Sequence, residues 1–308
     1  MAKVDTILQG DVIERLKDIE DNTIQCVVTS PPYWGLRDYG EDNQLGLEET
    51  PEEYVENMVN VFREVKRVLK DDGTLWLNLG DSYNTTQAGN KTWGDGVGSN
   101  KQYAKGIIPK KRNKTLGLKP KDLVGIPWRV AFALQQDGWY LRQDIIWHKP
   151  NPMPESVTDR CTKSHEYIFL MSKSANYYYD AESIKEKTIT NDNINRDRET
   201  TRLNNTPGRT RMEGLKTNNY EKRNKRSVWK INTKPYKEAH FAVFPEKLPE
   251  LCIKAGSKEG DIVLDPFFGS GTTGFVAQRL YRKWIGIELN PEYIKIANKR
   301  FVQQELFV

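Results

Sequence analysis

Residues 29–33 read T-S-P-P-Y and close the apolar run IQCVV. Proline lacks an N–H and restricts the residue before it to extended conformations, so Ser30 and Pro31 are both expected to be extended. The resulting hook presents the Ser30 hydroxyl and the Pro31 carbonyl as two acceptors, with the ring of Tyr33 just beyond. Two converging acceptors suit an amino group, and the ring suits stacking on a planar heterocycle. Taken alone, the stretch is equally compatible with a simple turn.

A second chemical motif is G-S-G-T-T-G at residues 269–274, which has the form GxGxxG. It follows the strand-like IVLD, opens a helix, and is followed by Glu288 at the end of the next strand-like segment. Glycine permits a tight turn and close approach of a ligand, and the N–H groups of a helix N-terminus attract an anionic group. A carboxylate such as Glu288 can accept hydrogen bonds from a ribose diol. The motif predicts a nucleoside cofactor, with a ligand-free turn as the alternative.

The elements that must position these motifs alternate between strand-like and helix-like patterns, which is typical of an α/β fold with a doubly wound, mostly parallel sheet. The clearest helix starts at the N-cap Thr50 and is expected to stop at K-D-D-G, before the strand TLWLNLG. Only 34 residues follow Gly274, so the remaining strands must come from the N-terminal half. The order is therefore permuted relative to most dinucleotide enzymes, which disfavours a nicotinamide oxidoreductase.

Composition limits the class of protein. The chain has 308 residues, of which 37% are hydrophobic, and it contains no apolar run approaching 18 residues, so a soluble intracellular protein is expected. Cys26, Cys161 and Cys252 are far apart, and the chain has only three histidines. Neither a disulfide framework nor a metal site is predicted.

Basic charge is concentrated in two stretches, although the net charge is only +5. Residues 84–121 hold nine Lys/Arg against one acid, and residues 185–237 hold fifteen against six. Such concentration is typical of a protein that binds a polyanion. Solvated loops without a ligand are the alternative for the charge runs alone.

The segments TSPPYWGLRDYG, VLDPFFGSGTTG and IGIELNPEYIKIANKR together resemble the S-adenosylmethionine-dependent amino-group DNA methyltransferases. The likeness extends through GTLWLNLGDSY, WYLRQDIIWHKPNPMPESVTDR, KSHEYIFLMSKS and HFAVFPEKLPELCIKAGS, and covers most of the chain outside the two basic stretches. The motif order, with the tetrapeptide first and the cofactor loop last, resembles the β-type group of that family.

The resemblance implies a class I methyltransferase domain with a permuted Rossmann-like sheet and a basic target-recognition insert. Residues 1–184 would form the catalytic half, with 84–121 as a basic loop, and residues 238–308 the cofactor-binding half. Residues 185–237 would form the target-recognition region. Implied partners are double-stranded DNA and, as further possibilities, a second copy of the chain and a cognate restriction endonuclease. The expected location is the cytoplasm of a bacterial or phage-infected cell, with no membrane partner.

The resemblance also implies residue roles. The catalytic tetrapeptide would be Ser30, Pro31, Pro32 and Tyr33. Residues implied to bind S-adenosylmethionine are Asp11, His240, Phe241, Asp265, Pro266, Phe267, Gly269, Ser270, Gly271, Thr272, Thr273 and Glu288. Asp11 would reach the adenine edge, although it could equally be the N-cap of the following helix. DNA contacts are expected from Lys110, Lys111, Arg112, Arg196, Arg198, Arg209, Arg211, Arg223 and Arg226.

An exocyclic amine is a poor nucleophile because its lone pair is delocalised into the ring. Acceptors at Ser30 and Pro31 would hold both N–H groups and free that lone pair to attack the sulfonium methyl in line. The base must first be flipped out of the duplex. In the resembled family serine at the first position is usual for cytosine N4 and aspartate for adenine N6, so N4-cytosine is the favoured target.

Other methyl acceptors and a non-enzymatic role are the alternatives to this interpretation. No cysteine follows a proline, which disfavours methylation of cytosine at carbon 5. A DNA-binding protein without catalysis is disfavoured by the intact tetrapeptide and glycine loop. Methylation of RNA or of a protein glutamine on a related scaffold is a further alternative.

Overall fold

The computed structural model describes residues 3–36, 38, 40–41, 44–84, 117–187, 222–233 and 244–305. The chain divides into two compact units, Ala181–Arg226 and the remainder, Met1–Asp180 with Ser227–Val308. In the smaller unit, the 3-10 helix η2 (Glu182–Ile184) precedes an antiparallel ribbon of β6 (Glu186–Lys187) and β7 (Lys222–Arg223).

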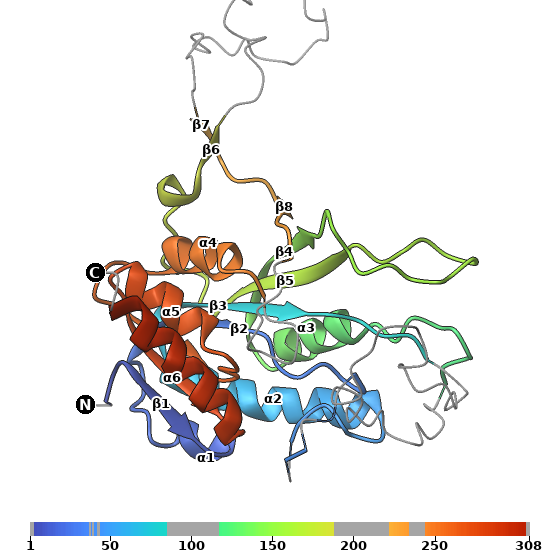
Figure 1. Ribbon diagram of the computed structural model, residues 1–308, viewed down its shortest axis with the longest axis horizontal. Coiled ribbons are helices and arrows are strands. Elements are labelled where there is room, and N and C mark those ends of the chain that lie inside the picture. Colours follow the sequence, from blue (N-terminus) through green and yellow to red (C-terminus); the bar gives the residue numbers. More distant parts are fainter. Residues whose placement is uncertain are drawn as a thin grey trace, which may run out of the picture. The chain divides into compact units, whose positions relative to one another are not determined.

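The larger unit is built on an eight-stranded sheet with the order β1-β10-β9-β2-β3-β5-β4-β8 (Figure 1). The strands are β1 (Thr6–Gln9), β2 (Ile24–Thr29), β3 (Leu69–Leu79), β4 (Tyr140–His148), β5 (His165–Ser172), β8 (Val228–Lys230), β9 (Ile262–Asp265) and β10 (Lys283–Glu288). Neighbouring strands are parallel except at β5, which is antiparallel to both β3 and β4. The predicted mostly parallel, permuted sheet is confirmed.

Helices cover both faces of this sheet. The helices α1 (Val12–Leu16), α2 (Pro51–Val68) and α3 (Ile126–Gln136) contact one another on one side. The helices α4 (Lys247–Gly256), α5 (Thr272–Arg279) and α6 (Pro291–Glu305) form the layer on the other side (Figure 1). The sheet is therefore doubly wound, and its apolar strands are buried between two helical layers.

The sequence of helix α2 explains where this helix begins and which of its sides is buried. Thr50 and Glu53 form a capping box, and Pro51 occupies the first turn, where its missing N–H costs nothing. The buried positions Tyr54, Met58, Val61, Phe62 and Val65 recur every three or four residues and face the core.

The permutation places the two chemical motifs side by side. Strand β9, from the C-terminal part of the chain, lies between β10 and β2, with Cys26 opposite Val263 and Val27 opposite Leu264. The strand that ends at T-S-P-P-Y and the strand that leads into the glycine loop are therefore direct neighbours, and both run in the same direction.

Two boundaries differ from the sequence-based prediction. Strand β3 begins at Leu69, so K-D-D-G lies within the strand and does not separate it from α2; buried Leu69 already pairs with Ile24. In addition, residues 228–230, inside the predicted target-recognition region, form β8 of the main sheet. The buried Trp229 packs against Trp76, with ring centroids 6.2 Å apart, which anchors this strand. Among the described residues, no helix is long and apolar enough to cross a membrane.

Candidate active site

The chemical motifs meet at one edge of the sheet. Strands β1, β2, β3, β9 and β10 are parallel and end there, at Gln9, Thr29, Leu79, Asp265 and Glu288. Because β5 runs the opposite way, its beginning comes to the same edge: Tyr167 pairs with Leu79 of β3, and Glu166 pairs with Trp147 of β4. Ligands of open α/β sheets bind beyond this edge.

Contacts with α2 and with Gly46 hold the hook formed by residues 30–33 in place. The hydroxyl of Tyr54, a fully buried residue of α2, donates to the Pro32 carbonyl at 2.8 Å. Gly46 lies against the hook: a Cβ there would be 3.1 Å from the Tyr33 carbonyl oxygen and 3.3 Å from Pro32. The Pro31 carbonyl accepts no hydrogen bond from the described residues, and its predicted contact with a ligand stays a prediction.

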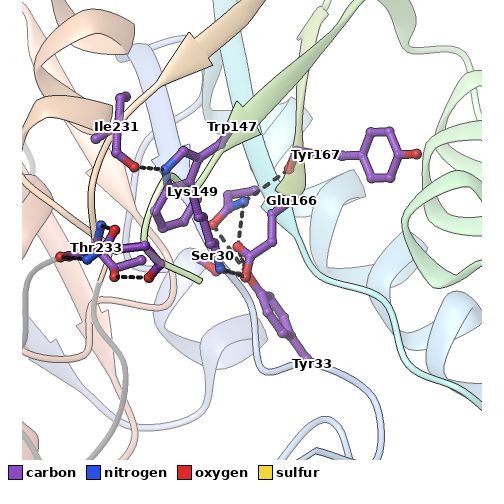
Figure 2. Close-up of polar contacts among 10 residues, drawn as sticks. Ser30, Tyr33, Trp147, Lys149, Glu166, Tyr167, Ile231 and Thr233 are labelled. Atoms are coloured by element: carbon purple, nitrogen blue, oxygen red, sulfur yellow. Dashed lines mark hydrogen bonds and ion pairs between the residues drawn. The ribbon is translucent and has the colours of Figure 1, made fainter. Parts of the chain in front are cut away.

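Tyr33 joins a buried polar network (Figure 2). Its hydroxyl donates to Glu166 Oε2 at 2.8 Å, with Asn78 Oδ1 at 3.3 Å, and the Ser30 hydroxyl donates to the Tyr33 oxygen at 3.3 Å. Burial, reinforced by the charge of Glu166, raises the pKa of the Tyr33 phenol well above its ordinary value. Lys149 forms an ion pair with the other oxygen of Glu166. Tyr33 is therefore neutral, and its ring is fixed by its hydroxyl.

Four residues of this site were missed by sequence reasoning as individual residues. Asn78, Lys149 and Glu166 lie within segments that carried the family resemblance, but no local motif marks them. Thr29 was quoted only as the start of T-S-P-P-Y. For Asn78 and Thr29 the signal in the sequence is a polar residue near the end of an apolar strand, and both are buried, at 2% and 1% exposed.

The glycine loop is shaped by close packing and by a carboxylate. Gly269 and Gly271 have φ of 54° and 78°, the left-handed region that favours glycine. Phe268 packs on Gly286 of β10 so tightly that a Cβ there would lie 2.3 Å from its ring. Glu288 accepts hydrogen bonds from Gly269 N at 2.7 Å and from Asn290 N at 2.8 Å. Burial raises the pKa of the Glu288 carboxyl, although these backbone N–H groups oppose the shift.

Asp265 connects the loop to the hook. Its carboxylate is 1% exposed and accepts from the Thr29 hydroxyl at 2.7 Å, the Thr273 hydroxyl at 2.6 Å and the Phe267 N–H at 3.1 Å. Burial raises its pKa to about 7. Since these groups surround the carboxylate, Asp265 serves the predicted cofactor site by shaping the loop. A direct contact to the cofactor stays a prediction.

The remaining predicted cofactor residues offer different groups. The hydroxyls of Thr272 and Thr273 are bonded internally, to Arg300 and to Asp265, so these residues offer a ligand their backbone N–H groups at the start of α5. Ser270 Oγ is buried and has no partner among the described residues. Asp11 caps α1 through Ile13 N and Glu14 N, at 2.9 and 3.1 Å. Its predicted contact with adenine stays a prediction.

Asp11 nevertheless lies close to the cofactor loop. The N–H of Gly10 donates to the carbonyl of Glu288 at 3.0 Å, where β1 and β10 end together. An unpartnered buried hydroxyl, a glycine-lined turn, free helix N–H groups and a strand-end carboxylate together fit a nucleoside with a charged tail.

Several predicted residues cannot be placed. His240, Phe241, Lys110, Lys111, Arg112, Arg196, Arg198, Arg209 and Arg211 lie outside the described residues. Of the predicted DNA-binding residues, Arg223 and Arg226 are described. Both donate through Nε to Glu186, at 2.9 and 2.6 Å, and Lys225 Nζ lies 3.3 Å from the same carboxylate. Burial would raise the pKa of Glu186, but these three hydrogen bonds lower it.

The proline hook lies beside the glycine loop on this permuted sheet, and the fold is that of a class I methyltransferase. The family model described as DNA methylase, for N6 and N4 amino methyltransferases, matches residues 24–299. The chain belongs to this family, and its cofactor is S-adenosyl-L-methionine.

The chain is similar along most of its length to two curated relatives. It is 51% identical over 298 residues to Type II methyltransferase M.SmaI of Serratia marcescens, covering 97% of this chain and 91% of the relative. It is 48% identical over 295 residues to M.Cfr9I of Citrobacter freundii, covering 96% and 87%.

Solved structures share the fold. The PvuII DNA methyltransferase (cytosine-N4-specific) superposes with a TM-score of 0.64 at 22% identity, covering 98% of this chain and 87% of that one. A DNA modification methylase from Thermus thermophilus, TTHA0409, complexed with S-adenosyl-L-methionine, gives 0.60 at 24% identity, covering 96% and 93%.

The raised pKa of Asp265 predicts a pH-dependent stability. Between about pH 4 and pH 7 the folded chain keeps the Asp265 proton while the unfolded chain has lost it, so this group costs folding free energy as pH rises. Asp265→Asn cannot titrate. The free energy of unfolding of this variant minus that of wild type should therefore rise with pH over this window, by at most about 1.4 kcal/mol per pH unit. Denaturant unfolding at stepped pH measures it. A flat difference between Asp265→Asn and wild type across this window would contradict the assignment.

Glu288 is expected to hold the cofactor ribose as an ionised acceptor. Glu288→Gln loses the charge and one acceptor position, and should weaken S-adenosylmethionine binding by about 10- to 100-fold, because a hydrogen bond to a charged group is lost. Titration calorimetry measures the dissociation constant. The matched control is Glu292→Gln, an exposed acid in the first turn of α6 that pairs with Lys295. Unchanged affinity in a folded Glu288→Gln variant would remove Glu288 from the cofactor site.

Proposed function

We propose that this chain is a Type II, site-specific DNA methyltransferase that methylates the exocyclic N4 amine of a cytosine flipped out of duplex DNA. The observation that carries the choice of cytosine is Ser30 at the head of the tetrapeptide, where the adenine-N6 branch usually has aspartate. The likeness to a cytosine-N4-specific structure is a likeness of fold at 22% identity, so it does not decide the base. Methylation at adenine N6 is the alternative.

The geometry of the hook supports chemistry at an amine. Ser30 Oγ can accept one N–H of the target, and the Pro31 carbonyl, which accepts nothing from the described residues, can accept the other. Holding both N–H groups favours a tetrahedral nitrogen whose lone pair points at the methyl donor. Orientation of this kind contributes about 7–11 kcal/mol in well-aligned reactions. The cofactor supplies the sulfonium methyl, and the chain positions the amine.

Residues 185–237 are proposed to carry most of the target recognition, and residues 84–121 to form a second DNA-contacting loop. The support in the described part is the cluster of Arg223, Lys225 and Arg226 around Glu186, which keeps an excess of positive charge after Glu186 is neutralised. Arg226 is 61% exposed at its side chain, so its guanidinium can reach a phosphate while Glu186 fixes its direction.

Further parts of the proposal follow from the same class. A cognate restriction endonuclease is expected as a partner in the cell because the curated relatives are Type II methyltransferases. A homodimer and a cytoplasmic location in a bacterial or phage-infected cell complete the expectation.

The identity of the methylated nucleoside tests whether cytosine or adenine is the target base. Wild-type protein is incubated with duplex DNA and S-adenosylmethionine, and the digested nucleosides are separated by mass spectrometry; 4-methylcytosine is expected, and 6-methyladenine would refute the choice of base.

Ser30→Ala should retain cofactor affinity and lose activity by about 100-fold or more, because an acceptor for the amine is removed. Undiminished turnover would refute the role of Ser30.

The salt dependence of DNA binding tests whether the basic cluster contacts phosphate. Arg226→Gln should weaken DNA binding alike for all sequences and reduce the slope of log K against log salt by about 1, since one phosphate contact releases about one counterion. Fluorescence anisotropy at stepped salt measures the slope. Arg279→Gln, an exposed ion-paired arginine in the last turn of α5, is the control that should leave the slope unchanged. An unaltered slope in Arg226→Gln would separate this arginine from DNA.

A further inference from the structure

The hydrogen bonds behind Ser30 run in one direction (Figure 2). An ionised carboxylate can only accept, so Tyr33 must donate its proton to Glu166 Oε2, at 2.8 Å. The Tyr33 oxygen is then an acceptor, and the Ser30 hydroxyl donates to it at 3.3 Å. Ser30 thus points its own proton into the protein and leaves its lone pairs for the substrate amine.

Glu166 is held in place by its surroundings. Lys149 pairs with Oε1, and its ammonium lies 4.4 Å from the centre of the Trp147 ring. Asn78 Nδ2 donates to Oε2 at 3.2 Å and to the Tyr167 carbonyl at 3.0 Å, which fixes the orientation of the amide. The glutamate is only 15% exposed at its side chain, so it is largely shielded from solvent.

We propose that Glu166 is the terminal proton acceptor of methyl transfer, reached from the substrate amine through the hydroxyls of Ser30 and Tyr33. The inference rests on the proposed function, and it holds for either amino base. Glu166 touches neither substrate nor cofactor in this scheme, so it is a positioning and proton-accepting residue that acts through Tyr33.

The step balances as follows. The nitrogen lone pair forms the bond to the methyl carbon, and the carbon–sulfur pair goes to sulfur. The amine proton passes to Ser30 Oγ as the Ser30 proton passes to the Tyr33 oxygen and the Tyr33 proton to Glu166 Oε2. The N–H bonding pair stays on nitrogen as its new lone pair. The positive charge of the sulfonium and the negative charge of Glu166 are both removed, and the methylated base leaves neutral.

A serine at the head of the tetrapeptide gives such a relay a purpose. Methylation of an exocyclic amine generates an acidic N–H that must lose its proton, and neither a neutral hydroxyl nor a carbonyl retains one. An aspartate at that position would bring a negative charge directly to the amine. Here the nearest carboxylate in the described network lies two hydroxyls away, at Glu166.

The test is a double-mutant cycle with Tyr33→Phe and Glu166→Gln. Tyr33→Phe keeps the ring and removes one link, whereas Glu166→Gln keeps the shape and removes the charge. Single-turnover methyl transfer to duplex DNA is measured with saturating cofactor and DNA. Each variant is expected to lose about 100-fold in rate, and the double variant to lose no more than either single change, because both break the same relay. The Michaelis constant for DNA and the dissociation constant for S-adenosylmethionine should stay within a few-fold of wild type.

Several outcomes decide against the relay. Losses that multiply in the double variant, unchanged rates, or losses confined to binding would each overturn it. Glu250→Gln is the matched control, since Glu250 is comparably buried and paired with lysines on α4; it should keep the wild-type rate. Should Glu166→Gln fail to fold, the solvent deuterium isotope effect decides: it should be normal in wild type and smaller in Tyr33→Phe, and equal effects would overturn the relay. Failure of the proposed function would instead appear in the product of the wild-type protein.

Discussion

The whole site depends on one buried carboxylate. Asp265 accepts from Thr29, the residue before Ser30 and 236 residues earlier in the chain, and from Thr273 in the first turn of α5. Burying a carboxylate is costly unless hydrogen bonds replace its water. Three donors do so here, and two of them join the strand that ends at the proposed acceptors of the amine to the proposed loop for the methyl donor. Methyl transfer needs the distance between those acceptors and that loop to be fixed, because misplacement of reacting atoms by about 1 Å can cost about 100-fold in rate.

Sheet topology explains why groups from four segments meet. Parallel strands deliver their ends to one edge, which brings Ser30, the glycine loop and Glu288 together. The antiparallel β5 delivers its beginning instead, and only this reversal brings Glu166 to the same edge. The chain order can be permuted without disturbing this, because strand neighbours, and not sequence neighbours, determine which side chains meet.

The residues that could be predicted from the sequence are those whose role is local. The extended S-P-P-Y hook follows from proline stereochemistry, the glycine loop from its strand–turn–helix context, and the ends of α2 from its capping residues. Thr29, Asn78, Lys149 and Glu166 could not be found in the same way, because their roles arise from strand register. Asp265 shows the same limit: the sequence indicates the right loop, but only the structure shows that its carboxylate faces Thr29 and Thr273. The start of β3 at Leu69 was missed because K-D-D-G reads as a turn, whereas pairing of Leu69 with Ile24 extends the strand.

Glu166 and Asn78 both determine the direction of the hydrogen bonds that link Ser30 to Tyr33. Asn78 donates with its nitrogen to Tyr167 and Glu166, so its oxygen faces Tyr33 at 3.3 Å. The Tyr33 hydroxyl therefore has two acceptors before it, Glu166 and Asn78, and among the described residues Ser30 is its donor. Once Glu166 has taken up a proton through the proposed relay, it becomes the donor to Tyr33, Tyr33 donates to Ser30, and the Ser30 proton faces the methylated base. When Glu166 releases that proton, Tyr33 again has Glu166 and Asn78 as acceptors, and the lone pairs of Ser30 return to the substrate side. In the proposed relay the network is therefore oriented for the amine before each turnover, and preorganised dipoles are the main source of electrostatic catalysis.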